Sequence, residues 1–226
     1  MALRRIALHY DCISPYSWIG FEVMMRHSRM WNDPTVRIEL KPTFLGGIMK
    51  GSGNKPPGVV AGKMVYMGRD LQRLNDFTDM ELNMLSDPFT TLFKKGSIKA
   101  MRAITAMDMT NPEVVERVSI EVWKQIWIHD RDITDEAILM DAFTSAGLTK
   151  NKAKEFLEMA GAKEVKNKLK ENTEEALDAG CFGAPSFIVR QDGEDDKMFF
   201  GQDRIELLCH QLELPYHGAA KEGKIF

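Results

Sequence analysis

The two ends of this 226-residue chain carry complementary halves of a mixed α/β pattern, and a long helical block separates them. Alternating apolar residues predict strands, and apolar residues at helical spacing predict helices. The opening half reads strand, helix, strand, and the closing half reads strand, turn, strand, helix. The expected strands are residues 5–10, 36–40, 186–190 and 197–200, and the expected terminal helices are residues 14–31 and a segment that begins at Asp203.

From about Lys63 to Ala179 every segment looks helical. Asn111-Pro112 and Thr134 are start signals, and three glycines are plausible stops, namely Gly147, Gly161 and Gly180. The two halves complete a thioredoxin-like sheet, which the chain leaves after the second strand and rejoins for the third. The predicted fold is therefore α/β, a thioredoxin-like domain (residues 1–60 and 180–226) interrupted by an all-helical insertion domain (residues 61–179).

A segment from Pro42 to Pro57 follows the second strand and is rich in glycine and proline. It has no periodicity, so we expect a loop. Its length indicates a functional loop rather than a simple connection.

The turn between the first strand and the first helix reads Ser14-Pro15-Tyr16-Ser17, where thioredoxin-like oxidoreductases carry Cys-x-x-Cys. Without those cysteines the turn cannot cycle a disulfide. A serine hydroxyl and backbone N–H groups at the positive end of a helix suit a sulfur that arrives on a small thiol, most simply glutathione. A plainer interpretation remains open, in which Ser14 only caps the helix and Pro15 takes its first position.

The composition indicates an ordinary globular protein, with 44% hydrophobic residues and a net charge of −3. No block of one charge sign suggests nucleic acid as a partner, and no apolar run approaches the ~20 residues that cross a bilayer. Membrane insertion and a secretory leader are therefore not expected.

The cysteines are few and far apart, and the histidines have no ligand-like neighbours. Cys12, Cys181 and Cys209 are odd in number, which favours buried free thiols over a disulfide scaffold. None of the five histidines stands in a ligand-like pattern, so we expect no metal site.

Three separated motifs together resemble the kappa class of glutathione transferases, in the branch related to bacterial disulfide oxidoreductases. The similarity runs over essentially the whole chain. The motifs are Ser14-Pro15-Tyr16-Ser17-Trp18, the loop from Gly47 to Pro57, and Gly201-Gln202-Asp203-Arg204-Ile205-Glu206-Leu207-Leu208.

The resemblance implies that Ser14 hydrogen-bonds the sulfur of glutathione and favours its thiolate, beside Pro15 and Tyr16. Pro185 falls where the fold places a cis-proline, and Ala184 before it should pair its backbone with the cysteinyl part of glutathione. The remaining glutathione contacts that the resemblance implies are Asn54, Lys63, Gln202 and Asp203.

The chain departs from the family pattern at two of these positions. Ala184 stands where leucine is frequent, which leaves a backbone role intact, and Gln202 stands where serine is common. Read without the family, Asn54 is a turn residue, Lys63 is a solvated charge at a helix start, and Pro185 is a trans-proline at a strand start.

The resemblance implies a glutathione transferase that acts in detoxification and conjugates glutathione, its co-substrate, to small electrophiles. Glutathione peroxidase activity is a further expectation. Two alternatives stay open: a glutathione-dependent isomerase of the hydroxychromene-carboxylate type, and a non-catalytic thiol- or peptide-binding chaperone. Trp18, Tyr66, Leu71 and Leu92 are candidate residues for the electrophile pocket.

The resemblance also implies a homodimer and a mitochondrial location, with no permanently bound cofactor. Met1-Ala2-Leu3-Arg4-Arg5 is a weak import signal, because it runs directly into the first strand. Lys224-Ile225-Phe226 is not a peroxisomal Ser-Lys-Leu signal, although a cytosolic or peroxisomal location stays open.

Overall fold

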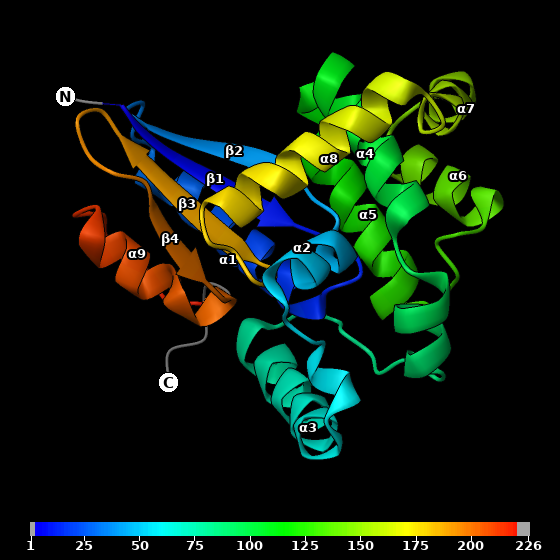
Figure 1. Cartoon of the computed structure of the whole chain (residues 1–226), viewed down its shortest axis with the longest axis horizontal. Coiled ribbons are helices and arrows are strands. Elements are labelled where there is room, and N and C mark those ends of the chain that lie inside the picture. Colours follow the sequence, from blue (N-terminus) through cyan, green and yellow to red (C-terminus); the bar gives the residue numbers. More distant parts are fainter. Residues whose placement is uncertain (1–2, 221–226) are drawn as a thin grey trace.

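The computed structural model describes residues 3–220, and a four-stranded sheet organises it (Figure 1). The strands are β1 (Arg4–Tyr10), β2 (Val36–Pro42), β3 (Ser186–Gln191) and β4 (Lys197–Phe200). Their order is β2-β1-β3-β4, with β1 parallel to β2 and antiparallel to β3. The N-terminal and C-terminal halves therefore meet along β1, where Leu8 lies opposite Phe187.

Nine α-helices surround this sheet within the described residues. They are α1 (Pro15–Trp31), α2 (Leu45–Ser52), α3 (Ala61–Thr78), α4 (Ile98–Thr110), α5 (Val115–Trp127), α6 (Glu136–Ser145), α7 (Lys150–Met159), α8 (Lys163–Asp178) and α9 (Ile205–Gln211). Short 3-10 turns cover Pro57–Val59, Pro112–Val114 and Gln202–Arg204, and a π-helical turn covers Thr90–Lys95.

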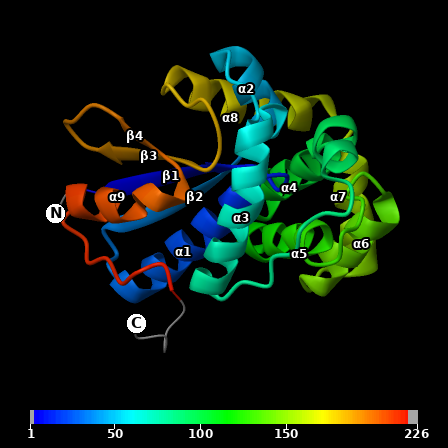
Figure 2. The same ribbon diagram turned by 90° about the horizontal axis from the view of Figure 1, so that it is seen from below.

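The sheet is covered on both faces, because successive side chains of β1 point to opposite faces and both sets are buried. Ile6, Leu8 and Tyr10 belong to the larger hydrophobic core with α1 and α9, whereas Ala7 packs with Ile48 of α2 and with residues of α8. Figure 2 shows α2 and α8 on one side of the sheet and α1 and α9 on the other. The predicted thioredoxin-like fold is confirmed, with α3–α8 inserted between β2 and β3.

The insert is joined to the sheet by aromatic packing rather than by a linker. Trp123 and Trp127 of α5 are almost fully buried. The ring of Tyr10, at the end of β1, lies 5.4 Å from that of Trp123, and its hydroxyl is 2.7 Å from Ser119 Oγ. The end of β1 that leads into the Ser14 turn is therefore fixed by the insert.

Four sequence expectations are corrected. The segment from Pro42 to Pro57 is not all loop, because it contains α2. The helical block is interrupted by irregular chain between α3 and α4, apart from the π-helical turn. The last helix does not begin at Asp203: a 3-10 turn occupies that position and α9 starts at Ile205, while Asp135 rather than Thr134 caps α6.

The cysteine expectation is confirmed, since all three cysteines are free and buried. Across residues 3–220 no helix combines the length and apolarity needed to cross a membrane. The expectations about Met1-Ala2 and about Lys224-Ile225-Phe226 lie outside the described residues.

Candidate active site

A pocket of about 950 Å³ opens where the β1–α1 turn, α3 and the chain before β3 converge. This volume is at the upper end of the ~300–1,000 Å³ typical of small-molecule sites. All nine residues that the sequence suggested line it, although they span 190 positions of the chain. They are Ser14, Pro15, Tyr16, Asn54, Lys63, Ala184, Pro185, Gln202 and Asp203.

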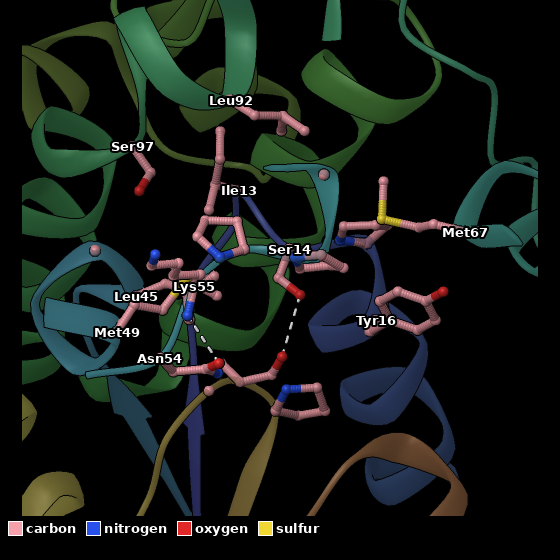
Figure 3. A pocket seen from close by; sticks show the side chains of 18 of the residues that line it. Ile13, Ser14, Tyr16, Leu45, Met49, Asn54, Lys55, Met67, Leu92 and Ser97 are labelled. Atoms are coloured by element: carbon pink, nitrogen blue, oxygen red, sulfur yellow. Dashed lines mark hydrogen bonds between the residues drawn. The ribbon is translucent and has the colours of Figure 1, made fainter. Parts of the chain in front are cut away.

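Ser14 is both a helix cap and a pocket residue. Its Oγ accepts a hydrogen bond from Ser17 N at 3.1 Å, which is the capping geometry. The same hydroxyl donates to Ala184 O at 3.3 Å, across the pocket (Figure 3). The Ser14 carbonyl accepts from Trp123 Nε1 at 3.2 Å, so the insert also holds the turn. The capping interpretation and the site interpretation therefore describe the same atom.

The Ala184–Pro185 peptide bond is cis, as expected for a proline that faces this turn. Pro185 O accepts from Gly201 N at 3.0 Å, which joins the chain before β3 to the turn before α9. A Cβ on Gly20 would lie 2.9 Å from Pro185 Cγ, so the glycine lets α1 approach the proline. Sequence analysis missed Gly20, since a helical glycine gives no sign of what it touches.

The polar residues expected to bind glutathione lie on the sheet side of the pocket or at its rim. Asn54 Nδ2 donates to Phe182 O at 2.7 Å, so this side chain also ties the α2 segment to the chain before β3. Lys63 is exposed at the start of α3. Asp203 is exposed beside Arg204, with Arg204 Nη1 3.2 Å from its carboxylate.

Asp11, which the sequence analysis did not single out, holds the backbone next to Ser14 in place. It is fully buried, and its two carboxylate oxygens accept from Ile13 N at 3.0 Å and from Leu45 N at 2.9 Å. Burial raises the pKa of Asp11, and these backbone hydrogen bonds oppose the rise. Asp11 thus connects the turn that carries Ser14 to the start of α2.

Two tyrosines converge on one carboxylate at the insert side of the pocket. Tyr16 Oη donates to Asp70 Oδ2 at 3.0 Å, and Tyr66 Oη donates to Asp70 Oδ1 at 3.2 Å. Burial, followed by the bond to Asp70, raises the pKa of Tyr16. No sequence motif pointed to Asp70, which lies 54 positions from Tyr16.

Of the four residues considered for an electrophile pocket, two line it. Tyr66 and Leu92 do so, whereas Trp18 and Leu71 are 3% and 0% exposed and belong to the core. Among residues 3–220 no group of three or more His, Cys, Asp or Glu side chains is arranged to hold a metal ion.

Known proteins resemble this chain in sequence and in fold. The DSBA-like thioredoxin domain matches residues 5–213. The chain is 40% identical to glutathione S-transferase kappa 1 of Homo sapiens over 209 residues, which cover 92% of this chain and 91% of the human one. It is 30% identical to glutathione S-transferase kappa 1 of Caenorhabditis elegans over 213 residues, which cover 94% of this chain and 92% of that protein.

Among solved structures, a 2-hydroxychromene-2-carboxylate isomerase superposes with a TM-score of 0.69 over 92% of this chain and 94% of the isomerase. Its sequence is only 18% identical, so it shows the shared fold alone. The family match and the identity to the kappa enzymes are decisive. This chain belongs to the kappa-class glutathione transferase family, within the DSBA-like thioredoxin proteins.

Proposed function

We propose that this protein is a glutathione transferase that stabilises the glutathione thiolate at Ser14 and conjugates it to small electrophiles. One observation supports this most strongly: the Ser14 hydroxyl, at the N-terminus of α1, faces the cis-proline strand across a pocket large enough for glutathione and a second substrate. The pocket also gathers both cationic and anionic side chains, which the two carboxylates and the ammonium group of glutathione require.

The proposed binding mode follows from the chemistry of each position. Ala184 pairs its backbone with the cysteinyl residue, as an added strand does. The Asp203 carboxylate takes the γ-glutamyl ammonium, with Gln202 beside it, and Lys63 takes the glycyl carboxylate near Asn54. Because α9 begins only at Ile205, Asp203 contributes through its side chain and the adjoining 3-10 turn.

The energetics are of the right size. A free thiol has a pKa of about 8.5, so about 3% is thiolate at pH 7. Lowering that pKa by about two units needs roughly 2.7 kcal/mol. One hydrogen bond to a charged group contributes about 1.5–3 kcal/mol, and a helix N-terminus adds about 0.3–1 kcal/mol.

Ser14 must turn its proton from Ala184 O to the sulfur. The bond that it gives up is long, at 3.3 Å, and is therefore weak. The bond from Ser17 N keeps the oxygen in place while the hydrogen rotates. The exchange also frees the Ala184 carbonyl to accept a hydrogen bond from the backbone of glutathione.

The decisive experiment is a glutathione titration across pH, followed by thiolate absorbance near 240 nm, for the wild type and Ser14→Ala. We expect a bound-thiol pKa well below about 8.5 in the wild type and a higher value in the variant. Ser14→Ala also removes a helix cap, so Thr149→Ala, which removes the cap of α7, is the matched control. No binding, or an unshifted pKa in the wild type, would contradict the proposal and leave a binding protein without thiolate chemistry.

We propose peroxidase activity at the same thiolate. The thiolate sulfur attacks the terminal oxygen of a hydroperoxide and the O–O bond breaks, which gives the sulfenic acid of glutathione. The alkoxide leaves and takes up a proton from water to become the alcohol. A second glutathione then reduces the sulfenic acid to glutathione disulfide and water. Disulfide formation coupled to NADPH consumption by glutathione reductase measures the activity, and a rate equal to that without protein would refute it.

We propose that the protein is a homodimer, because many apolar side chains are exposed on α3 and the chain around it. Large exposed apolar patches commonly mark protein interfaces. Those more than one third exposed in this region are Val59, Val60, Met64, Val65, Tyr66, Phe77, Met84, Phe89 and Phe93. Sedimentation equilibrium should give twice the monomer mass, and Val65→Lys should shift it toward the monomer. A wild-type monomer would refute the proposal.

For location we propose the mitochondrion, on the family resemblance. Imaging of the protein tagged internally, with its native termini intact, tests this. A purely cytosolic signal would refute it.

A further inference from the structure

The pocket has two sides, one that mixes polar and apolar side chains and one that is mostly apolar, and Ser14 lies between them. In Figure 3, Asn54 and Lys55 lie to the left of Ser14 beside Leu45 and Met49, while Ile13 and Leu92 lie above Ser14 and Met67 lies to its right. We call this second side the apolar wall, which comprises Ile13, Tyr16, Met67, Leu74, Leu92 and Ile98. The glutathione contacts proposed above lie outside this wall, except for Tyr16. The wall is therefore where an electrophile would meet the sulfur.

The half-buried carboxylate of Asp70 borders the apolar wall, and Lys63 and Lys95 also line the pocket. Each carboxylate oxygen of Asp70 accepts a hydrogen bond from a tyrosine, Tyr16 of α1 or Tyr66 of α3. The phenol protons are committed to Asp70, so neither tyrosine has a proton left for a substrate in this arrangement. What the wall offers a ligand is thus acceptor oxygens and a negative charge.

No cation neutralises this carboxylate within the part of the chain that the structure describes. The described salt bridges do not include Asp70. Lys95, which also lines the pocket, pairs with Asp132 at 2.9 Å. Lys63 lies two turns before Asp70 on α3, roughly 10 Å away by the helical rise. Within residues 3–220, the Asp70 carboxylate therefore has two tyrosine hydroxyls as partners and forms no salt bridge.

We infer that Asp70 is a specificity-determining residue that excludes anionic electrophiles and admits neutral or cationic ones with an apolar body. This inference rests on the proposed transferase function. An anionic substituent placed against the wall would lose hydration and meet an unneutralised like charge at short range. A neutral substrate of the same shape meets only the apolar side chains and acceptor oxygens, so the two should differ in reactivity although their sizes are equal.

Two aryl chlorides of matched shape test the inference, 4-chloro-3-nitrobenzamide and 4-chloro-3-nitrobenzoate. In each, the glutathione thiolate attacks the carbon that bears chlorine, a C–S bond forms and chloride leaves. The kcat/KM of each is divided by its uncatalysed rate constant with glutathione, which removes the difference in intrinsic electrophilicity. The ratio of these quotients, amide over carboxylate, measures discrimination by the protein.

We expect the wild type to favour the amide and Asp70→Asn to lower the ratio about tenfold, which corresponds to about 1.4 kcal/mol. Asparagine keeps the size of the side chain and one acceptor oxygen for the tyrosines. Tyr66→Phe is the matched control, because it removes one of the same hydrogen bonds and leaves the charge, so its ratio should stay within about twofold of the wild type. An unchanged ratio in Asp70→Asn, or an equal fall in Tyr66→Phe, overturns the inference.

A binding measurement keeps the test independent of turnover and of the folding of the variant. Calorimetry with 3-nitrobenzamide and 3-nitrobenzoate, both without a leaving group, compares the two charges on the wild-type protein with glutathione present. Weaker binding of the carboxylate supports the inference, and equal or stronger binding overturns it. Failure of the proposed transferase function would instead show as an unshifted thiol pKa in the glutathione titration, which this comparison does not use.

Discussion

Replacing Asp11 by alanine should destabilise the protein by an amount that its contacts allow us to work out. The carboxylate is fully buried and accepts from Ile13 N and Leu45 N. Alanine leaves both amides without an acceptor, at about 1–2 kcal/mol each, because the two bonds are only partly buried. The sum, about 3 kcal/mol, corresponds to a fall in Tm of roughly 6–12 °C for a chain of this size.

The assay is urea unfolding followed by tryptophan fluorescence, with a thermal scan beside it. Asp11→Asn keeps one acceptor oxygen, so its loss of stability should be about half that of Asp11→Ala, roughly 1.5 kcal/mol. Because burial raises the pKa of Asp11, the folded protein binds the extra proton at a pH above 3.8, the ordinary pKa of an aspartate. The stability of the wild type relative to Asp11→Asn should therefore decline as the pH rises through that range.

Asp135→Ala is the matched control, since this aspartate also accepts from a backbone amide, Ala137 N at 2.8 Å, but in an exposed helix cap. We expect a loss of only about 1 kcal/mol there. If Asp11→Ala were no less stable than Asp135→Ala, the assignment of Asp11 as the support beneath the Ser14 turn would be wrong.

His27 should make the protein acid-sensitive, because its Nδ1 lies 2.8 Å from Val23 O and its Nε2 accepts from His217 N at 3.0 Å, an arrangement that needs the neutral ring. Burial lowers the pKa of His27, so the stabilisation by this residue is present above about pH 6.5 and is lost as the pH falls through the lowered pKa. On acidification, the urea midpoint of His27→Gln should therefore drop less than that of the wild type. Gly201→Ala should lower the free energy of unfolding in urea by about 1–2 kcal/mol, because φ is 99° at this position and the new Cβ would lie 2.6 Å from Asp203 Oδ1. Calorimetry should also show weaker glutathione binding, and a wild-type stability together with a wild-type affinity would contradict this prediction.

The sheet could be predicted from the sequence because its signal is local. β1 and β3 are short runs of residues that are buried on both faces of the sheet, and the Ser14 turn is recognisable from five consecutive residues. The boundaries moved by one or two residues, as at β2, which extends to Pro42 rather than ending at Leu40.

Helix α2 could not be predicted, because its glycines carry the wrong local signal. A Cβ on Gly47 would lie 3.0 Å from Thr173 Cγ2, and one on Gly51 would lie 2.5 Å from Leu177 Cδ1. These glycines let α2 approach α8 closely, so they favour tertiary packing although glycine has a low helix propensity. No pattern within residues 42–57 contains that information.

The candidate site divides in the same way. Ser14, Pro185 and Asn54 belong to recognisable motifs, so sequence could suggest them. Asp70 is one acid among many on an amphipathic helix, and its relation to Tyr16 arises only when α3 folds over α1. Residues whose role depends on a contact between distant elements leave no local trace.

The position of β1 at the centre of the sheet has a consequence for synthesis of the chain. β1 pairs with β3, which begins only at Ser186, after the whole insert. At about 5–20 residues per second, a ribosome needs roughly 9–35 s to make the chain between β1 and β3. During that interval one edge of β1 has no strand beside it, and unpaired edges invite association with other chains. We expect the nascent protein to depend on early folding of the insert, or on a chaperone, until its last quarter has been made.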